Sequence, residues 1–133
     1  MNTKASRRPL STTILVCEDD EQLGILVEIM LSEHGYNVLL AARAEQALEL
    51  ATEHASIDVL VTDVELPQMS GPELLGLLQT KFPALEVLLL SGYPADAMPG
   101  APLPDGYAFL QKPFSENSLL QMIHSLAPNT PTY

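Results

Sequence analysis

Short, densely apolar runs alternate along this chain with longer stretches in which apolar residues recur every three or four positions. This alternation is typical of a parallel sheet covered by helices, because strands that are buried on both faces have few polar positions. Five apolar runs are predicted to be strands: residues 14–17, 38–40, 59–62, 86–90 and 107–110. The pattern therefore predicts an α/β domain with a doubly wound, five-stranded parallel sheet and flanking helices.

Four stretches between or after these runs are predicted to be helices. In the first stretch, the apolar residues that we expect to face the core are Leu23, Leu26, Val27, Met30 and Leu31. Gly35 can end that helix in the left-handed conformation. Residues 44–53 and 72–82 predict two further amphipathic helices. Ser115 can cap a last helix, which ends before Pro128.

A proline-rich segment over residues 93–106 interrupts the alternation. Its prolines and glycines are Pro94, Pro99, Gly100, Pro102, Pro104 and Gly106. A proline inside a helix removes a hydrogen bond and costs roughly 3 kcal/mol. We therefore expect the fourth helix of the alternation, between the last two strands, to be shortened to at most about two turns or to be irregular.

The composition indicates one soluble domain. With 133 residues, the chain is long enough for one core, and we expect a disordered arm over 1–10, a folded domain over 11–127 and a disordered tail over 128–133. No apolar run reaches the roughly 18 residues that would cross a bilayer, and the first residues lack the apolar stretch of a secretory signal. The single cysteine, Cys17, cannot form an internal disulfide and is predicted to be buried in a strand. These features predict a cytoplasmic protein without membrane contact.

The formal net charge of −11 limits the partners of the chain. Beyond Leu10 the basic residues are Arg43, Lys81 and Lys112. Such an acidic surface repels phosphate backbones, so we expect no direct binding to nucleic acid.

Polar residues follow the predicted strands where each strand ends. They are Glu18, Asp19 and Asp20 after the first strand, Asp63 after the third, Ser91 after the fourth and Lys112 after the fifth. The carboxyl ends of parallel strands share one edge of a sheet, so these side chains are predicted to meet. Carboxylates at this density would repel one another without a cation, and their oxygens suit Mg²⁺.

The charges of this edge balance when Mg²⁺ is included. Glu18, Asp19 and Asp63 carry three negative charges, and Lys112 with one Mg²⁺ supplies three positive charges. A neutralised pocket with a hard cation can accept a phosphoryl group, whose transfer depends on positioning and on charge compensation. Asp63 can then act as the nucleophile.

Four segments of the chain resemble the signature segments of response-regulator receiver domains in two-component systems. They are LVCEDDE, LVTDVELPQMSGPEL, LLLSGY and FLQKPF, in the order and spacing of the family, within a resemblance that spans residues 12–126. The resemblance implies a flavodoxin-like fold and a phosphorylatable switch rather than an enzyme, one that catalyses only its own phosphorylation and dephosphorylation. The amino-acid sequence of the later segments is similar to that of receivers at the C-terminus of hybrid histidine kinases.

The resemblance also implies a role for each matching residue. It assigns the Mg²⁺ ligands to Glu18, Asp19, Asp63 and the backbone carbonyl of Val64. Asp63 matches the phosphoacceptor, and Lys112 matches the lysine that assists phosphorylation. The implied phosphoryl donor is a histidine kinase or a histidine phosphotransfer domain.

The remaining matches concern the conformational switch. Ser91 matches the hydroxyl that moves to the phosphoryl oxygen, and Phe109 matches the aromatic switch residue. Pro113 falls where the family has a cis peptide. Asp20 is interpreted as a cap of the first helix rather than as a metal ligand. The histidines His34, His54 and His124 receive no phosphotransfer role.

Two alternatives from other classes remain. A phosphohydrolase of the haloacid dehalogenase type also uses a strand-terminal aspartate and Mg²⁺, but it needs a second aspartate two positions later, where this chain has Glu65. A pseudo-receiver would keep the fold as an interaction module without phosphorylation, but such chains usually lose the acceptor, the acidic pair or the lysine. Turnover of a small phosphate ester would identify the first, and failure to be phosphorylated would identify the second.

Overall fold

A computed structural model describes residues 12–94 and 107–127 of the chain. Five parallel strands form one sheet in the order β2-β1-β3-β4-β5. The strands are β1 Thr13–Cys17, β2 Asn37–Ala41, β3 Val59–Asp63, β4 Glu86–Ser91 and β5 Ala108–Gln111. The sheet confirms the predicted flavodoxin-like, doubly wound α/β fold. From β1 the chain adds β2 on one side of the sheet and then β3, β4 and β5 on the other, so the direction of strand addition changes between β1 and β3.

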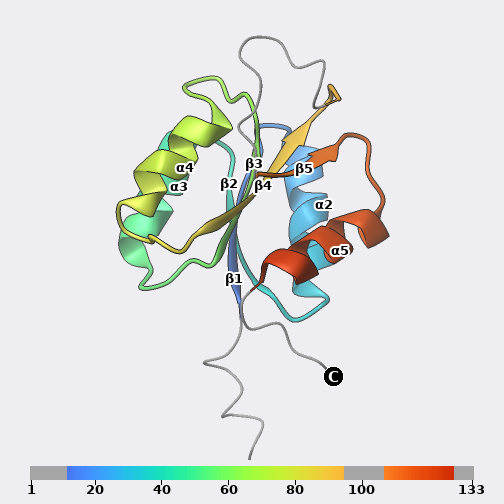
Figure 1. The fold of residues 1–133 in the computed structure, drawn as a ribbon, viewed down its shortest axis with the longest axis horizontal. Helices are drawn as coiled ribbons and strands as arrows, with labels where there is room; N and C mark the ends of the chain where they lie inside the picture. The colour runs from blue at the N-terminus through green and yellow to red at the C-terminus, as the bar shows by residue number, and fades with distance from the viewer. Residues whose placement is uncertain (1–11, 95–106, 128–133) are drawn as a thin grey trace, which may run out of the picture.

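Within the described residues, four helices cover the two faces of this sheet (Figure 1). They are α2 Glu21–Ser32, α3 Ala44–Glu53, α4 Gly71–Gln79 and α5 Glu116–Leu126. Helices α3 and α4 lie on one face, and α2 and α5 lie on the other (Figure 1). No helix within residues 12–94 and 107–127 is long and apolar enough to cross a membrane.

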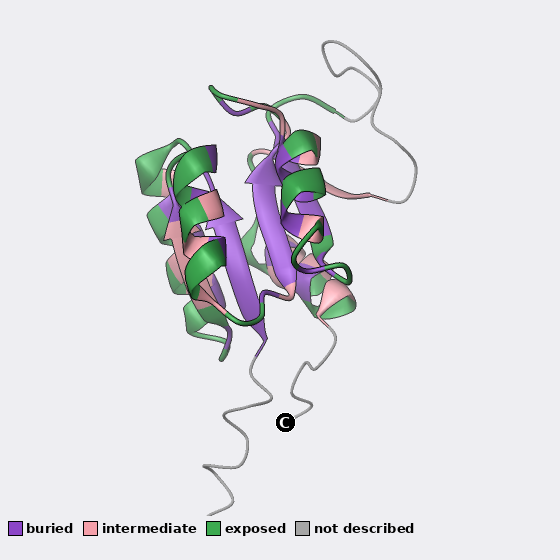
Figure 2. Cartoon of the chain, turned by 90° about the vertical axis from the view of Figure 1, so that its left-hand side faces the viewer, coloured by how far each residue is buried: buried purple, intermediate pink, exposed green. Residues whose placement is uncertain are grey.

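The central strands β1, β3 and β4 are almost wholly buried between the two layers of helices, as the burial colouring in Figure 2 shows. Side chains alternate between the faces of a strand, so Leu15 and Leu60 belong to the cluster under α3 and α4. Ile14 and Val61 belong to the cluster under α2 and α5. The strands are therefore apolar on both faces, which explains why their sequence pattern does not alternate.

The helix α2 differs from its predicted core face at one position. Gly24, Val27 and Leu31 are buried, but Leu26 is 47% exposed. At 100° per residue, Leu26 lies about 200° around the helix from Gly24 and therefore points away from the buried stripe. The prediction that Leu26 faces the core is wrong, and Leu26 instead joins the exposed side chains of Ile25 and Ile29.

The helix α4 is shorter than the range 72–82 predicted for it, because it ends at Gln79. The N–H groups of Lys81 and Phe82 still donate to the carbonyl of Leu78 in a tightening turn. Phe82 precedes Pro83, and a residue before proline avoids the α-helical conformation.

The predicted arm over 1–10, the tail over 128–133 and the irregular fourth helix of the alternation fall almost wholly outside the described residues.

Candidate functional site

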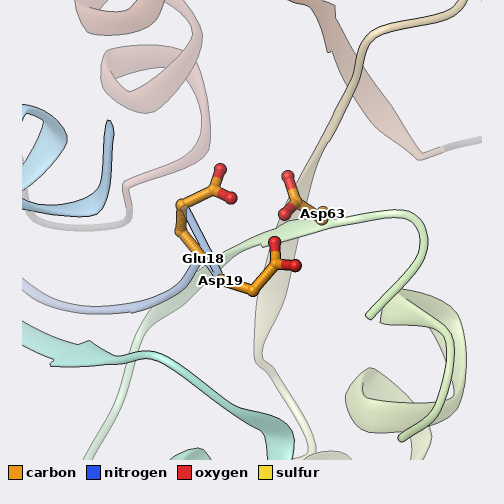
Figure 3. A group of neighbouring side chains, drawn as sticks. All are labelled: Glu18, Asp19 and Asp63. Atoms are coloured by element: carbon orange, nitrogen blue, oxygen red, sulfur yellow. The ribbon is translucent and has the colours of Figure 1, made fainter. Parts of the chain in front are cut away.

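The carboxyl edge of the sheet brings together three acidic side chains. Glu18 and Asp19 follow β1, and Asp63 is the last residue of β3, the neighbouring strand. Figure 3 shows the three carboxylates converging in front of these two strand ends. One carboxylate oxygen from each residue lies within 4.8 Å of the others. The sequence prediction that these residues meet is therefore confirmed by their positions.

Lys112, which follows β5, bridges two of these carboxylates. Its Nζ lies 2.9 Å from Oε1 of Glu18 and 2.6 Å from Oδ1 of Asp63. The second oxygen of Glu18, Oε2, accepts a 3.0 Å hydrogen bond from the N–H of Asp20. Glu18 is almost fully buried and Asp63 is 5% exposed, so water screens these charges poorly.

The electrostatics of the pocket oppose ionisation of Asp63. Burial raises the pKa of Asp63 to about 8, with a further increase from Glu18, and Lys112 offsets only part of this. Burial lowers the pKa of Lys112, but Asp63 and Glu18 more than reverse that effect, so the ammonium form is favoured. The pocket thus holds more negative charge than its lysine can balance.

The donor set of the pocket fits Mg²⁺. Three carboxylates with a net negative charge offer the hard oxygen ligands that this ion prefers. The carbonyl of Val64, also predicted to be a ligand, accepts a 2.6 Å hydrogen bond from the N–H of Gly71. One of its lone pairs is therefore engaged, and the second would serve a metal. Its role as a ligand remains a prediction.

A cavity of about 150 Å³ opens beside the Asp63 carboxylate. Asp63 and Lys112 line it together with Glu65, Ser91 and Tyr93. Ser91 ends β4, the strand next to β3, and its Oγ accepts a 2.9 Å hydrogen bond from the N–H of Tyr93. The tyrosine is 52% exposed, so it stands at the mouth of the cavity. The space suits a small tetrahedral group bound beside the carboxylate.

Several residues outside the pocket also match their predicted settings. Asp20 caps α2 by accepting a 3.2 Å hydrogen bond from the N–H of Leu23. The peptide before Pro113 is cis. Phe109 is half-buried and packs against the cluster under α3 and α4. Cys17 is buried, and this burial, together with the nearby carboxylates, raises the pKa of its thiol to about 12.

The histidines lie in local helical surroundings. The Nδ1 atoms of His34 and His54 are 3.0 and 2.8 Å from the carbonyls of Met30 and Leu50, one helical turn earlier. His124 lies in the last turn of α5. The assignment of no phosphotransfer role to these histidines stays a prediction.

One feature of the site was missed in the sequence. Ser70 and Glu73 form a reciprocal capping box at the start of α4, with hydrogen bonds of 3.1 and 2.9 Å. The signal was present, because a serine followed three residues later by glutamate before an apolar run marks such a box. The box fixes the helix start that follows the loop after Asp63.

Comparison with known proteins gives one family. The profile described as "Response regulator receiver domain" matches residues 14–124. Sensor kinase CckA of Brucella abortus is 34% identical over 92% of this chain, and transcriptional regulatory protein CpxR of Escherichia coli K12 is 36% identical over 85%. The chain spans only 13% of the first relative and 48% of the second.

Solved structures agree with this match. The crystal structure of the receiver domain from hybrid histidine kinase CckA has a TM-score of 0.73 at 32% identity, covering 86% of this chain and 97% of that one. The chemotaxis protein CheY4 of Vibrio cholerae has a TM-score of 0.74 at 24% identity, covering 87% and 98%, and supports the fold alone. The resemblance to receivers of hybrid histidine kinases is thereby confirmed.

Proposed function

We propose a function from one premise: this chain belongs to the response regulator receiver domain family, a group of signalling modules rather than ordinary enzymes. It takes a phosphoryl group onto Asp63 from a histidine kinase or a histidine phosphotransfer domain, with Mg²⁺ as cofactor. Phosphorylation then acts as a conformational switch. The observation that carries this proposal is the bridge of Lys112 between Asp63 and Glu18, at 2.6 and 2.9 Å, beside three converging carboxylates.

The proposed chemistry assigns each side chain a task. Glu18, Asp19, Asp63 and the carbonyl of Val64 would hold Mg²⁺, which supplies charge compensation when bound. A carboxylate oxygen of Asp63 attacks the phosphorus, and the bond from phosphorus to the donor's imidazole nitrogen breaks as the new bond forms. Lys112 keeps its proton and pairs with the incoming phosphoryl oxygens.

The switch would use two residues on neighbouring strands. Ser91 lines the cavity and would turn its hydroxyl toward the phosphoryl oxygen. Phe109 lies on β5, which pairs with β4, so its half-buried ring can respond to a shift at the end of β4. A change confined to the pocket would in this way alter the surface near β5.

The setting of the domain is part of the proposal. Residues 11–127 form the receiver, with residues 1–10 and 128–133 as flanking segments. The match to sensor kinase CckA supports a hybrid histidine kinase as the source of such a receiver or as its donor. We place this phosphorelay in the cytoplasm, and the acidic charge of the chain argues against direct contact with nucleic acid.

Intact-mass measurement with a small acyl-phosphate donor and Mg²⁺ tests the proposal. The parent should gain one phosphoryl group, and Asp63→Asn should gain none. Asp58→Asn is the matched control, because Asp58 lies just before the opposite end of β3, where its Oδ2 accepts from the N–H of Thr13. This control should be phosphorylated as fully as the parent.

Two results would reject the assignment. Equal modification of Asp63→Asn and the parent would place the acceptor elsewhere, and an unchanged rate after Mg²⁺ chelation would remove the metal from the reaction. A parent that folds and binds Mg²⁺ but is never phosphorylated would instead be a pseudo-receiver. Sustained turnover of a phosphate ester would indicate a phosphohydrolase.

A further inference from the structure

The loop between β3 and α4 folds back onto the strand that carries Asp63. The N–H of Leu66 donates to the carbonyl of Met69 at 3.0 Å, and Glu65 and Ser70 form an antiparallel bridge. The N–H of Gly71 then donates to the carbonyl of Val64 at 2.6 Å. The loop therefore closes on itself, and the first residue of α4 lies against the end of β3.

Gly71, the first residue of α4, lies tightly against the acceptor strand. A Cβ at this position would overlap the backbone carbonyl oxygen of Asp63 and would lie 3.0 Å from Cγ2 of Thr62 and 3.2 Å from Cδ2 of Leu89. The carbonyl of Asp63 cannot rotate away freely, because it also accepts a 3.1 Å hydrogen bond from Oγ1 of Thr62. Any side chain at Gly71 must therefore displace either α4 or the backbone of Asp63.

The need for glycine at this position is steric. Among the described residues, Gly35 is the glycine with a positive φ, at 91°. Gly71 has no positive φ, so left-handed backbone is not the reason for a glycine there. At Gly76, which also lies in α4, a Cβ would meet no neighbouring atom within 4 Å, and the residue is exposed. The two glycines of α4 thus differ mainly in what surrounds them, which makes Gly76 a matched control.

We propose that Gly71 is a positioning residue for the phosphoacceptor. Its missing side chain lets α4 press against β3, so that the Asp63 carboxylate stays 2.6 Å from Nζ of Lys112 and the Val64 carbonyl keeps its direction. This inference rests on the proposed function of Asp63. It adds a residue that touches neither metal nor phosphoryl group and acts through the backbone of the residue that does.

The test compares Gly71→Ala with Gly76→Ala. Titration calorimetry gives the Mg²⁺ affinity, and intact mass gives the phosphorylation rate at saturating Mg²⁺, both at a temperature where denaturant curves show folded protein. We expect Gly71→Ala to lose about tenfold or more in both quantities, since small misplacements of reacting groups have effects of this size. Gly76→Ala should keep both parental values. Parental affinity and rate in folded Gly71→Ala would overturn the inference.

A second variant separates backbone displacement from crowding of side chains. Thr62→Ser removes the methyl group that a Cβ at Gly71 would touch but keeps the hydroxyl that donates to the Asp63 carbonyl. In the Gly71→Ala background, this change should leave the defect in place, because the overlap with the Asp63 carbonyl persists. Restored Mg²⁺ affinity and rate would show simple crowding and would reject the positioning role.

If Gly71→Ala does not fold, Ser70→Ala provides the test, because it loosens the start of α4 without adding an atom. We expect about a threefold loss of Mg²⁺ affinity in that variant, and an unchanged affinity would reject the inference. The Mg²⁺ measurement also keeps the two proposals apart. A parent that is never phosphorylated rejects the function of Asp63, whereas the role of Gly71 stands or falls with metal affinity.

Discussion

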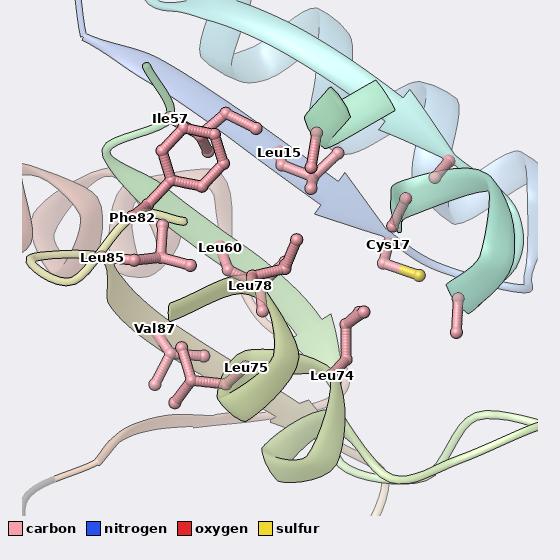
Figure 4. Packing of buried hydrophobic residues seen from close by; sticks show 14 of the residues in the cluster. Leu15, Cys17, Ile57, Leu60, Leu74, Leu75, Leu78, Phe82, Leu85 and Val87 are labelled. Carbon is pink, nitrogen blue, oxygen red and sulfur yellow. The ribbon is translucent and has the colours of Figure 1, made fainter. Parts of the chain in front are cut away.

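The middle of the sheet and its carboxyl edge are both buried, but burial has opposite energetic consequences in the two regions. In the middle, Leu60 is fully buried in the cluster shown in Figure 4, and removing its side chain from water favours folding. At the edge, burial disfavours the charged form of Asp63 and raises its pKa to about 8. The carboxylates of the edge therefore oppose folding in the metal-free protein.

Residues that stabilise the fold and residues of the candidate site therefore lie close together on the same strand. Leu60 and Asp63 are three residues apart on β3 and share the same two neighbouring strands. The first is explained by the core alone, and the second fits the Mg²⁺ site and the phosphoacceptor role proposed above. Proteins commonly hold such unfavourable groups in their functional sites.

The largest expected effect tests the middle of the sheet. Leu60→Ala should lower the free energy of unfolding by about 3 kcal/mol, because it leaves a cavity in a fully buried cluster. Leu77→Ala is the control, since Leu77 in α4 is 49% exposed and its loss should change stability by less than about 0.5 kcal/mol. Urea denaturation of both variants measures this, and similar effects in the two would contradict the assigned core.

The second prediction concerns the edge. In the absence of Mg²⁺, Asp63→Asn should raise the free energy of unfolding by about 1 kcal/mol near neutral pH, because the folded parent must either protonate Asp63 or bury its charge beside Glu18, and asparagine removes that cost. Added Mg²⁺ should then stabilise the parent and leave the variant nearly unchanged. Thermal denaturation with and without Mg²⁺ measures both effects. A variant less stable than the metal-free parent would show that the bond from Asp63 to Lys112 outweighs the burial of charge.

The pH dependence of stability tests the same difference between the middle of the sheet and its carboxyl edge. The pKa of Asp63 rises from 3.8 to about 8 on folding, so between these values the folded protein binds more protons than the unfolded chain. Stability contributed by Asp63 is therefore present at low pH and is lost as the pH rises toward 8. The advantage of Asp63→Asn over the metal-free parent should be small near pH 4 and should grow up to about pH 8. A constant difference across this range would mean that Asp63 keeps its ordinary pKa.

Much of this arrangement could be predicted from the sequence, because strand ends are visible in the hydrophobic pattern. Once β1 and β3 are recognised, parallel topology places Glu18 and Asp63 at one edge without any knowledge of distances. The cap at Asp20 was predicted for a similar reason, since it depends on residues three positions apart. Local spacing and sheet topology together predict that the acidic side chains meet, whereas the roles of Val64, Ser91 and Phe109 come from the family resemblance alone.

The features that sequence could not predict depend on contacts between distant segments. The exposure of Leu26 is decided by which side of α2 meets the sheet, and the helix has more apolar residues than that side can bury. The close approach of Gly71 to Asp63 is set by the closure of the loop after β3. The bridge from Lys112 to both Glu18 and Asp63 likewise requires three strand ends in register.

The smallest expected effect lies at the mouth of the pocket, where a side chain belongs to neither region. Tyr93 lines the cavity and is 52% exposed, so its removal should hardly change stability. Its ring can shield an acyl phosphate on Asp63 from water, whereas Glu65, which also lines the cavity, can orient water or repel a hydroxide-like nucleophile. We expect shielding to dominate, so Tyr93→Ala should shorten the phosphorylated lifetime several-fold, on the order of 1 kcal/mol of barrier.

Tyr93→Phe separates the ring from the hydroxyl in this last prediction. The phenylalanine keeps an aromatic ring at this position of the cavity lining, so its phosphorylated form should decay at nearly the parental rate. Decay is followed by intact mass after the donor is removed, with the free energy of unfolding measured in parallel. Equal lifetimes in the parent and Tyr93→Ala would show that the ring does not protect the acyl phosphate. A short lifetime in Tyr93→Phe as well would show that the hydroxyl of Tyr93 protects the acyl phosphate. Access of water to Asp63 would then depend on hydrogen bonding at the opening of the cavity rather than on shielding by the ring.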